Sequence, residues 1–344
     1  MPLYRFLLLC VFAIVLTAFA GCRPKEDAEP FRISFALNTV CTVFLYNQAK
    51  ADVYRGIFDR IHEIESRMSA FQPDSDIARI NASAGIAPVR VNDDVFFVME
   101  RALRFAEISG GAFDPSVGPL VSLWGIMSDN PRVPSEEEIN AVLPLVNWRN
   151  VELNLEDRSV FLTQRGMALD LGAIAKGYAA DEAVAIVRGA RLERALIDLG
   201  GNVITYGIKQ DRTPWRIGLQ TPQSDANRGD FVGFVSGGNM TVVTSGIYER
   251  YFLHDGVRYH HLFSPFDGYP ARTGLLSTTI VSSASMDADA LSTAIFVLGY
   301  ERGRAMVESL EGVEAIFIFD DMTVRKTSGV DLTITDHNFR LLTD

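Results

Sequence analysis

The chain has 344 residues and a formal net charge of -11, from 43 Asp and Glu against 32 Lys and Arg. It is 48% hydrophobic and 22% charged, an ordinary globular composition that excludes the disordered, collagen-like and low-complexity classes. The length allows one large domain or two small ones. The acidic balance argues against general nucleic-acid binding, because a phosphate backbone attracts a basic face. It does not exclude a small phosphorylated ligand held through a metal ion.

The N-terminal segment is predicted to be an export signal. The apolar run from Phe6 to Ala20 has the length of a signal-peptide core, whereas a membrane-spanning helix needs roughly 20 residues. Small residues directly before Cys22 resemble a bacterial lipobox. We therefore expect a signal peptide at 1–21, acylation of Cys22 (palmitate or a similar chain), and a solvated tether over 22–30. The protein would be lipid-anchored to a bacterial membrane and would face the periplasm or the cell exterior. A plain secretory signal or membrane anchor is the alternative.

The cysteine count agrees with this interpretation. Cys10 lies in the segment expected to be removed, and Cys22 would carry lipid, so only Cys41 remains in the mature chain. No internal disulfide is then possible. Because Cys41 falls in a predicted strand, we expect it to be a small core residue rather than a nucleophile.

Hydrophobic periodicity and capping signals predict the elements in chain order. Helices are expected over 51–68, from Asn92 or Asp93 to Gly110, briefly after the capping box of Ser135 and Glu138, over 174–188 and over 287–298. Strands are expected over 33–46, 150–155, 159–163, 167–171, 195–199, 203–206, 215–220, 230–236, 240–244, 257–263 and 313–319.

Helices and strands are intermixed without a regular strand–helix repeat, which favours an α+β fold over a doubly wound sheet. We expect residues 31–344 to form a single domain around a mixed central sheet with packed helices. No GxGxxG follows a strand, and the chain has no Walker loop, CxxC or HExxH. The common nucleotide and zinc motifs are therefore absent.

Two glycine-rich segments offer backbone N–H groups to a ligand. The first, 110–120, surrounds Asp114 with small and rigid residues; it is either a ligand loop or a structural turn in which Asp114 bonds its own backbone. In the second, Asp170 closes a predicted strand, Gly172 turns, and Lys176 lies in the first helical turn. A helix N-terminus favours anions, so a cation there indicates a phosphate-facing role; the alternative is a surface lysine.

Hydroxyl and imidazole groups follow in two further segments. Thr244, Ser245 and a glycine suit a small oxygen-binding turn, or an ordinary Ser/Thr turn. His261 lies in the run 260–268, and histidine can accept a proton near neutral pH; a packed structural histidine is the alternative.

The last segment suits a hard cation. Asp289 and Thr293 are four residues apart and so share one helical face, beside small alanines that allow another backbone close by. A carboxylate, a hydroxyl and a nearby carbonyl make an oxygen site suited to Mg²⁺ and poor for zinc or copper. The alternative is an acidic helix start with Thr293 simply packed.

Taken in order, these segments resemble the ApbE family, the FAD:protein FMN transferases. The likeness covers most of the chain, from about residue 37 to 299, and each of its pieces is weak alone. The six pieces are GGAFDPSVGPLVSLWG, DLGAIAKGYAAD, LIDLGGNV, VVTSGIYER, HHLFSPFDG and DADALSTA. The resemblance implies an α+β fold whose central sheet is shared with a smaller lobe.

The resemblance also implies a reaction and its ligands. A Thr (or Ser) hydroxyl of a target protein would attack the diphosphate of FAD with Mg²⁺ bound, so that FMN stays on the target and AMP leaves. Typical targets are subunits of Rnf- and Nqr-type membrane redox complexes. Asp289, Thr293 and the backbone carbonyl of Ala173 would bind Mg²⁺, and His261 is the candidate base. The expected FAD contacts are Leu37, Phe71, Ala112, Phe113, Asp114, Asp170, Lys176, Thr244 and Ser245.

This sequence departs from the family pattern at three places. Leu37-Asn38-Thr39 stands where the family has Met-Gly-Thr, and Phe71 stands where Tyr is frequent, which keeps ring stacking but loses a hydroxyl. The family acid three residues after the histidine is Ser264 here, and an acid appears at Asp267. The acid that orients His261 has therefore moved or is missing.

Two other functions use the same segments, namely hydrolysis of FAD to FMN and AMP, and non-catalytic FAD binding by a lipoprotein.

Overall fold

A nine-stranded sheet forms the centre of the computed structural model, which describes residues 31–46, 51–209, 211–223 and 229–342. The strands are antiparallel except at β15 and β17. In sheet order they are β1 (Phe31–Ala36), β2 (Thr39–Leu45), β6 (Ala195–Leu199), β7 (Asn202–Tyr206), β10 (Thr241–Gly246), β13 (Leu275–Ser282), β14 (Glu314–Phe319), β15 (Thr323–Lys326) and β17 (Arg340–Leu341).

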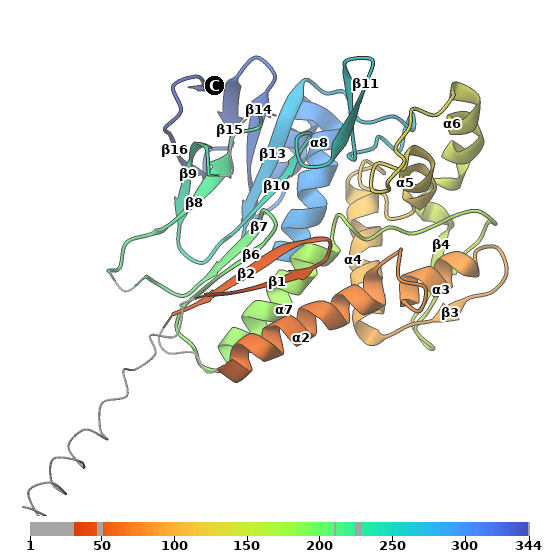
Figure 1. The fold of residues 1–344 in the computed structure, drawn as a ribbon, viewed down its shortest axis with the longest axis horizontal. Coiled ribbons are helices and arrows are strands. Elements are labelled where there is room, and N and C mark those ends of the chain that lie inside the picture. The colour runs from red at the N-terminus through yellow and green to blue at the C-terminus, as the bar shows by residue number, and fades with distance from the viewer. Residues whose placement is uncertain (1–30, 47–50, 210, 224–228, 343–344) are drawn as a thin grey trace, which may run out of the picture. The chain divides into compact units, whose positions relative to one another are not determined.

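Long helices cover one face of this sheet (Figure 1). α7 (Ala175–Gly189) packs between α2 (Ala51–Met68) and α8 (Ser285–Glu308), and α4 (Asp93–Ile108) packs on α8. α2 buries an apolar stripe at the predicted spacing, including Ile57, Ile61 and Ile64. The sequence therefore encodes the helix layer directly.

A small sheet covers the other face. Its strands, in the order β16 (Asp331–Ile334), β9 (Phe231–Gly237) and β8 (Trp215–Gln220), bury apolar residues against β14 and β15. Side chains of β14 alternate between the layers: Ala315 and Phe317 join the helix side, while Ile316 and Ile318 join the small sheet. At β14 the central sheet is thus buried on both faces.

A smaller lobe completes the fold. It holds α3 (Asp76–Ala82), β3 (Val89–Arg90), α5 (Gly118–Trp124), α6 (Glu136–Val142), β4 (Val151–Asn154), β5 (Ser159–Leu162), and two short 3₁₀ turns, 143–145 and 148–150. A third apolar cluster surrounds the fully buried Trp124. The hairpin of β11 (Tyr251–His254) and β12 (Val257–His260) packs on this cluster. This architecture confirms the predicted mixed α+β fold with a smaller lobe.

Four local predictions were wrong. The segment 33–46 is a hairpin, because Leu37 and Asn38 take left-handed φ angles of 51° and 56° and turn the chain. The strand predicted at 257–263 ends at His260, where the chain leaves the hairpin. Thr244 and Ser245 lie within β10 rather than in a turn, paired with Thr279 and Thr278 of β13.

The segment 167–171 is extended but is not a strand. Its backbone groups bond to a loop and a side chain: the Asp170 N–H donates to the Pro115 carbonyl, and the side chain of Asn81 bonds both backbone groups of Leu169. The β-branched pattern that predicts strands does not report which partner the backbone finds.

Cys41 is fully buried, as predicted. Cys22 and the predicted signal peptide and tether lie outside the described residues. Among the described residues, none of the helices combines the length and apolar character that a membrane crossing requires.

Candidate functional site

Two helix N-termini meet where the predicted metal residues lie. Neither α7 nor α8 begins with a residue whose side chain caps it, since their N-cap residues are Ile174 and Ala284. Each helix is capped instead by an aspartate of the other. Asp289 of α8 accepts a 2.9 Å hydrogen bond from the Gly177 N–H, and Asp181 of α7 accepts from the first two N–H groups of α8 at 2.9 Å each.

Gly177 makes this exchange sterically feasible. A Cβ atom added at Gly177 would lie 2.2 Å from the backbone carbonyl oxygen of Ser285. The two helices therefore approach more closely than any residue with a side chain would allow. The close approach carries Asp289 to the start of α7.

The three predicted metal-binding groups lie around this junction. The Gly177 N–H, which an α-helix would direct to the Ala173 carbonyl, is taken by Asp289. Within the part of the chain that the structure describes, no backbone N–H donates to that carbonyl. Thr293 Oγ1 lies 3.3 Å from Ser245 Oγ, which in turn lies 2.8 Å from Ser292 Oγ. The set offers one carboxylate, one hydroxyl and one free carbonyl, which suits a hard cation such as Mg²⁺.

Such a set differs from a conventional metal cluster. Among the described residues there is no group of three or more His, Cys, Asp and Glu side chains that could hold a metal ion. A site with a single protein carboxylate leaves charge and coordination positions for ligand oxygens. The donors fit a cation that binds together with a phosphate ligand.

Lys176 and Asp170 border the same junction. Lys176 Nζ donates to the Gly172 carbonyl at 3.0 Å and lies 3.5 Å from Asp289 Oδ1. Asp170 accepts from the Gly172 N–H at 2.7 Å. Burial raises the pKa of Asp170, and the charges of Arg250 and Lys176 act in the opposite direction. The lysine therefore lies beside the anionic groups of the site rather than on the open surface.

His261 is held by a backbone carbonyl. Its Nδ1 lies 3.2 Å from the Arg250 carbonyl oxygen, so Nδ1 carries the hydrogen and Nε2 is left as an acceptor. Burial, with Arg250 nearby, lowers the pKa of His261 to about 3. The ring is therefore neutral at pH 7 and has one nitrogen able to accept a proton.

The neighbouring histidine is structural. His260 Nε2 lies 3.1 Å from the Ala271 carbonyl oxygen, and its Nδ1 accepts from the Leu262 N–H. Burial lowers the pKa of His260 to about 4. Both ring nitrogens are engaged, so His260 has no acceptor to offer a substrate.

Neither Ser264, which stands where the family has an acid, nor Asp267 orients the His261 ring. Ser264 is buried and bonds through its backbone to Tyr269 and Gly268. Asp267 is exposed and accepts from the Tyr269 N–H at 3.0 Å, which makes it a turn residue. The Arg250 carbonyl takes the orienting role that an acid would otherwise fill.

The remaining predicted FAD contacts differ in accessibility. Ala112, Phe113 and Asp114 are buried, and both oxygens of Asp114 accept hydrogen bonds, one from Ser116 and one from the Trp148 N–H. Asp114 therefore shapes its loop and has little capacity left for a ligand.

Leu37 and Phe71 remain available to a ligand. Leu37 turns β1 into β2 and is tied to Glu65 through its N–H, while the ring of Phe71 is 70% exposed. The Thr244 hydroxyl is engaged by Thr279 Oγ1 at 2.8 Å.

Two site residues were missed by the sequence analysis, although both lie in the segment VVTSGIYER. Desolvation of its carboxylate raises the pKa of Glu249 to about 7 although the residue as a whole is exposed, and the charged groups acting on it include Lys176 and Asp289. Arg250 donates to the Asn38 carbonyl at 3.1 Å, which ties the β1–β2 turn to the site. Their position four and five residues after Ser245 was the available signal.

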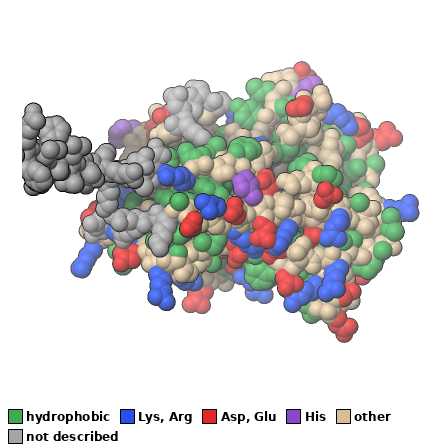
Figure 2. All heavy atoms as spheres, turned by 60° about the horizontal axis from the view of Figure 1, so that its bottom comes forward, with side chains coloured by type: hydrophobic (Ala, Val, Ile, Leu, Met, Phe, Trp, Pro, Cys, Tyr) green, Lys and Arg blue, Asp and Glu red, His purple; other side chains and the backbone are tan. Residues whose placement is uncertain are grey.

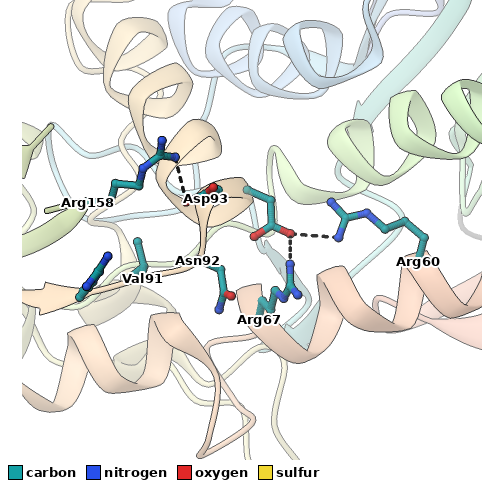
Figure 3. Close-up of a pocket in the computed structure, with 8 residues that line it drawn as sticks. Arg60, Arg67, Val91, Asn92, Asp93 and Arg158 are labelled. Atoms are coloured by element: carbon teal, nitrogen blue, oxygen red, sulfur yellow. Dashed lines mark hydrogen bonds and ion pairs between the residues drawn. The ribbon is translucent and has the colours of Figure 1, made fainter. Parts of the chain in front are cut away.

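A cavity lies elsewhere, among arginines of α2, β3 and the β4–β5 turn and beside the N-terminus of α4. It measures about 720 Å³ and is lined by Arg60, Arg67, Arg90, Val91, Asn92, Asp93, Asp94 and Arg158. Arg60 and Arg67 bond the Asp94 carboxylate, at 3.1 and 2.7 Å. Figure 3 shows Arg158 meeting Asp93. Acids therefore compensate three of the four arginines, and this network joins helices.

The surface around this cavity carries both positive and negative side chains. Figure 2 shows Lys and Arg side chains interspersed with Asp and Glu over that face of the molecule. A large polyanion therefore has no continuous basic surface to follow there.

Comparisons with known proteins give one consistent family. Residues 37–317 match the model of the ApbE family. An FAD:protein FMN transferase of Treponema pallidum is 39% identical over 338 residues, covering 93% of each chain. One from Klebsiella pneumoniae is 40% identical over 274 residues, covering 80% of this chain and 84% of the relative.

Solved structures agree. The ApbE protein of Thermotoga maritima superposes with a TM-score of 0.78 at 33% identity, covering 89% of this chain and 96% of that one. The flavin transferase ApbE of Vibrio cholerae gives a TM-score of 0.75 at 27% identity over the same shares.

Proposed function

This chain belongs to the ApbE family, and from that membership we propose that it is an FAD:protein FMN transferase that requires Mg²⁺. It transfers FMN from FAD to a Thr (or Ser) hydroxyl of a target protein and releases AMP. The observation that supports the proposal is the junction of α7 and α8, where Asp289 accepts from the Gly177 N–H and lies 3.5 Å from Lys176 Nζ, with Thr293 one helical turn further along α8.

The residues present fit a bound Mg²⁺ through Asp289, Thr293 and Ala173. Bound there, Mg²⁺ would neutralise charge on the diphosphate oxygens and on the departing AMP. Lys176 adds a fixed positive charge near the same oxygens, in a site partly removed from water. These groups lessen the repulsion that an attacking hydroxyl meets at an anionic diphosphate.

His261 supplies the base of the proposed reaction. The acceptor oxygen forms a bond to the FMN phosphorus, the phosphorus–oxygen bond to AMP breaks, and the hydroxyl proton passes to Nε2 of His261. Arg250 and Lys176 contribute to the lowered pKa of this histidine, and an FAD diphosphate would compensate both charges. Binding of FAD therefore makes His261 a stronger base when the acceptor arrives.

The test uses purified protein with FAD, Mg²⁺ and the soluble domain of an Rnf- or Nqr-type subunit. Covalent flavin on the acceptor, with one AMP released per flavin attached, supports transfer. Free FMN without modified acceptor supports hydrolysis instead, and bound FAD without turnover supports a carrier. EDTA is expected to stop the reaction and added Mg²⁺ to restore it; activity unaffected by EDTA overturns the metal assignment.

The cellular context is part of the proposal. We expect acylation at Cys22 to tether the enzyme to a bacterial membrane, facing the periplasm or the cell exterior, where its acceptors are exported flavoproteins. Labelling cells with a palmitate analogue tests this: the wild type should be labelled and Cys22→Ala should not. Mass spectrometry of exported proteins with and without the gene would identify the Thr that receives FMN.

A further inference from the structure

The hairpin of β11 and β12 ends directly at the candidate base. Among the strands that the structure describes, its two strands pair only with each other, and Asp255 and Gly256, with φ angles of 50° and 75°, give the turn its hairpin geometry. The pairing continues one step beyond the strands, where the His261 N–H donates to the Arg250 carbonyl at 3.1 Å. The hairpin is therefore a ribbon whose root contains His261.

One side of the ribbon is anchored. Phe252 and Tyr259 stack with ring centroids 5.4 Å apart, and Tyr259 packs 5.4 Å from Trp124. Trp124 is fully buried, and its indole N–H donates to the Gly268 carbonyl. This contact fixes the position of a two-stranded ribbon that would be only marginally stable by itself.

The far end of the ribbon is exposed and apolar. Leu253 is 64% exposed and Val257 41%, and Phe266, in the loop after His261, is 53% exposed. Figure 1 shows the hairpin extending beyond the end of the central sheet. A ribbon with free edges and apolar side chains pairs readily with other chains, and proteins usually blunt such edges with charges or cover them.

Arginines lie along and beside the ribbon, and Arg258 is paired with Leu253 near its far end. Arg258 lies over the Tyr251 ring at 4.4 Å, and among the described residues it makes no ion pair. Arg258 and Arg272 both act electrostatically on His260, and Arg250 acts on His261. Arg250 therefore lies at the root of the hairpin, Arg258 near its far end and Arg272 close to His260, in segments that also hold the exposed acids Asp255 and Asp267.

We propose that the β11–β12 hairpin is the docking surface for the acceptor protein, through a segment with apolar and acidic residues beside its target hydroxyl. This inference rests on the proposed function, in which a protein hydroxyl must reach Nε2 of His261. The hairpin is the element that leads to that nitrogen. Its apolar end supplies contact area, its arginines select an acidic segment, and its free edges can pair with an extended backbone.

The test compares transfer with FAD binding in the same variants. The double variant Leu253→Asp and Val257→Asp, and separately Arg258→Glu, should lower kcat/KM for the acceptor about tenfold or more. The affinity for FAD, followed by flavin fluorescence, should stay within about twofold, because none of these residues is assigned to the FAD site. The acceptor used is the Rnf- or Nqr-type soluble domain.

Leu155→Asp is the matched control. Leu155 is 72% exposed on the turn between β4 and β5, in a different sheet, and its variant should transfer FMN at the wild-type rate. The double variant Leu253→Ser and Val257→Ser removes the apolar side chains without adding charge. It replaces the double aspartate variant if that one fails to fold, and it should also lower the rate of transfer.

The outcomes separate the two proposals. Transfer at the wild-type rate by the hairpin variants overturns the docking surface while the proposed function stands. A wild type that modifies no acceptor overturns the proposed function itself. A wild-type dimer that becomes monomeric in the hairpin variants, seen by light scattering, overturns acceptor docking in favour of a second copy of the chain.

Discussion

Asp289 accepts a hydrogen bond of 2.9 Å from the backbone N–H of Gly177, and so one carboxylate caps α7 while facing the candidate metal position. A buried N–H that loses its acceptor costs about 1–3 kcal/mol. The Asp289 side chain therefore has a capping role in the fold and a metal-binding role in the proposed reaction, and substitutions of Asp289 can separate these two roles.

Asp289→Asn is expected to keep the acceptor for Gly177 and remove the charge. Transfer should fall at least about a hundredfold, while the melting temperature stays close to that of the wild type. Asp289→Ala should lose activity equally and also about 1–3 kcal/mol of unfolding free energy. Rates with FAD and Mg²⁺, and denaturant unfolding, measure the two effects. Equal stability of the Asn and Ala variants would refute the capping role.

Asp181→Ala should destabilise the protein by about 1–2 kcal/mol. Its carboxylate accepts from Ser285 and Met286, the first two N–H groups of α8, and the N-cap residue Ala284 offers no substitute. Urea unfolding gives the measurement. Glu311→Ala, an exposed acid outside the helices, is the control and should change the stability by less than about 0.5 kcal/mol.

Gly177→Ala should cost about 3 kcal/mol or more, because the added Cβ would lie 2.2 Å from the Ser285 carbonyl oxygen. Gly189→Ala lies at the other end of the same helix, where a Cβ meets nothing within 4 Å. That variant should be neutral or stabilised by up to about 1 kcal/mol. If thermal unfolding gave both variants the same shift, the close packing of α7 on α8 would be disproved.

His260 should make stability depend on acid pH. Its folded pKa is lowered to about 4 from an ordinary 6.5, so its contribution is fully present above pH 6.5 and is lost as pH falls toward 4. The unfolding free energy should drop by about 3 kcal/mol over that range from this residue. His260→Gln should remove this residue's share of the dependence and leave the share of His261, whose pKa is also lowered, whereas His254→Gln, at an exposed site, is the control. An unchanged profile in His260→Gln would contradict the assignment.

Phe71→Ser should weaken FAD binding about tenfold and leave folding intact. The ring is 70% exposed, so its removal forfeits little packing, while a flavin or adenine ring would lose its stacking partner. Fluorescence titration with FAD and thermal unfolding are the two measurements. Ile86→Ser, at another exposed apolar position of the same lobe, should alter neither. Unchanged FAD affinity in Phe71→Ser would remove this residue from the site.

The local elements followed from the sequence where one short-range signal determined them. The stripe of α2 places apolar residues on one helical face, and the capping box of Ser135 and Glu138 is present as predicted before α6. β8 has the predicted bounds because its residues alternate between buried and exposed. Such patterns depend on neighbours within a few residues, so a single sequence contains them in full.

Tertiary structure decided what long-range partners determine. β13, in the middle of the central sheet, escaped prediction because its buried Thr278 and Thr279 find backbone and hydroxyl partners that no local pattern reports. The same holds for the candidate site.

The sequence by itself placed Asp289, Thr293, Lys176 and His261 in separate segments, and it provided the family resemblance that joined them. Only the fold showed that α7 and α8 cap each other, and that a backbone carbonyl orients His261 in place of an acid. The helix caps join residues more than a hundred positions apart and the His261 contact joins residues eleven apart, and neither has a sequence signature, because their geometry exists only once the sheet and helices have packed.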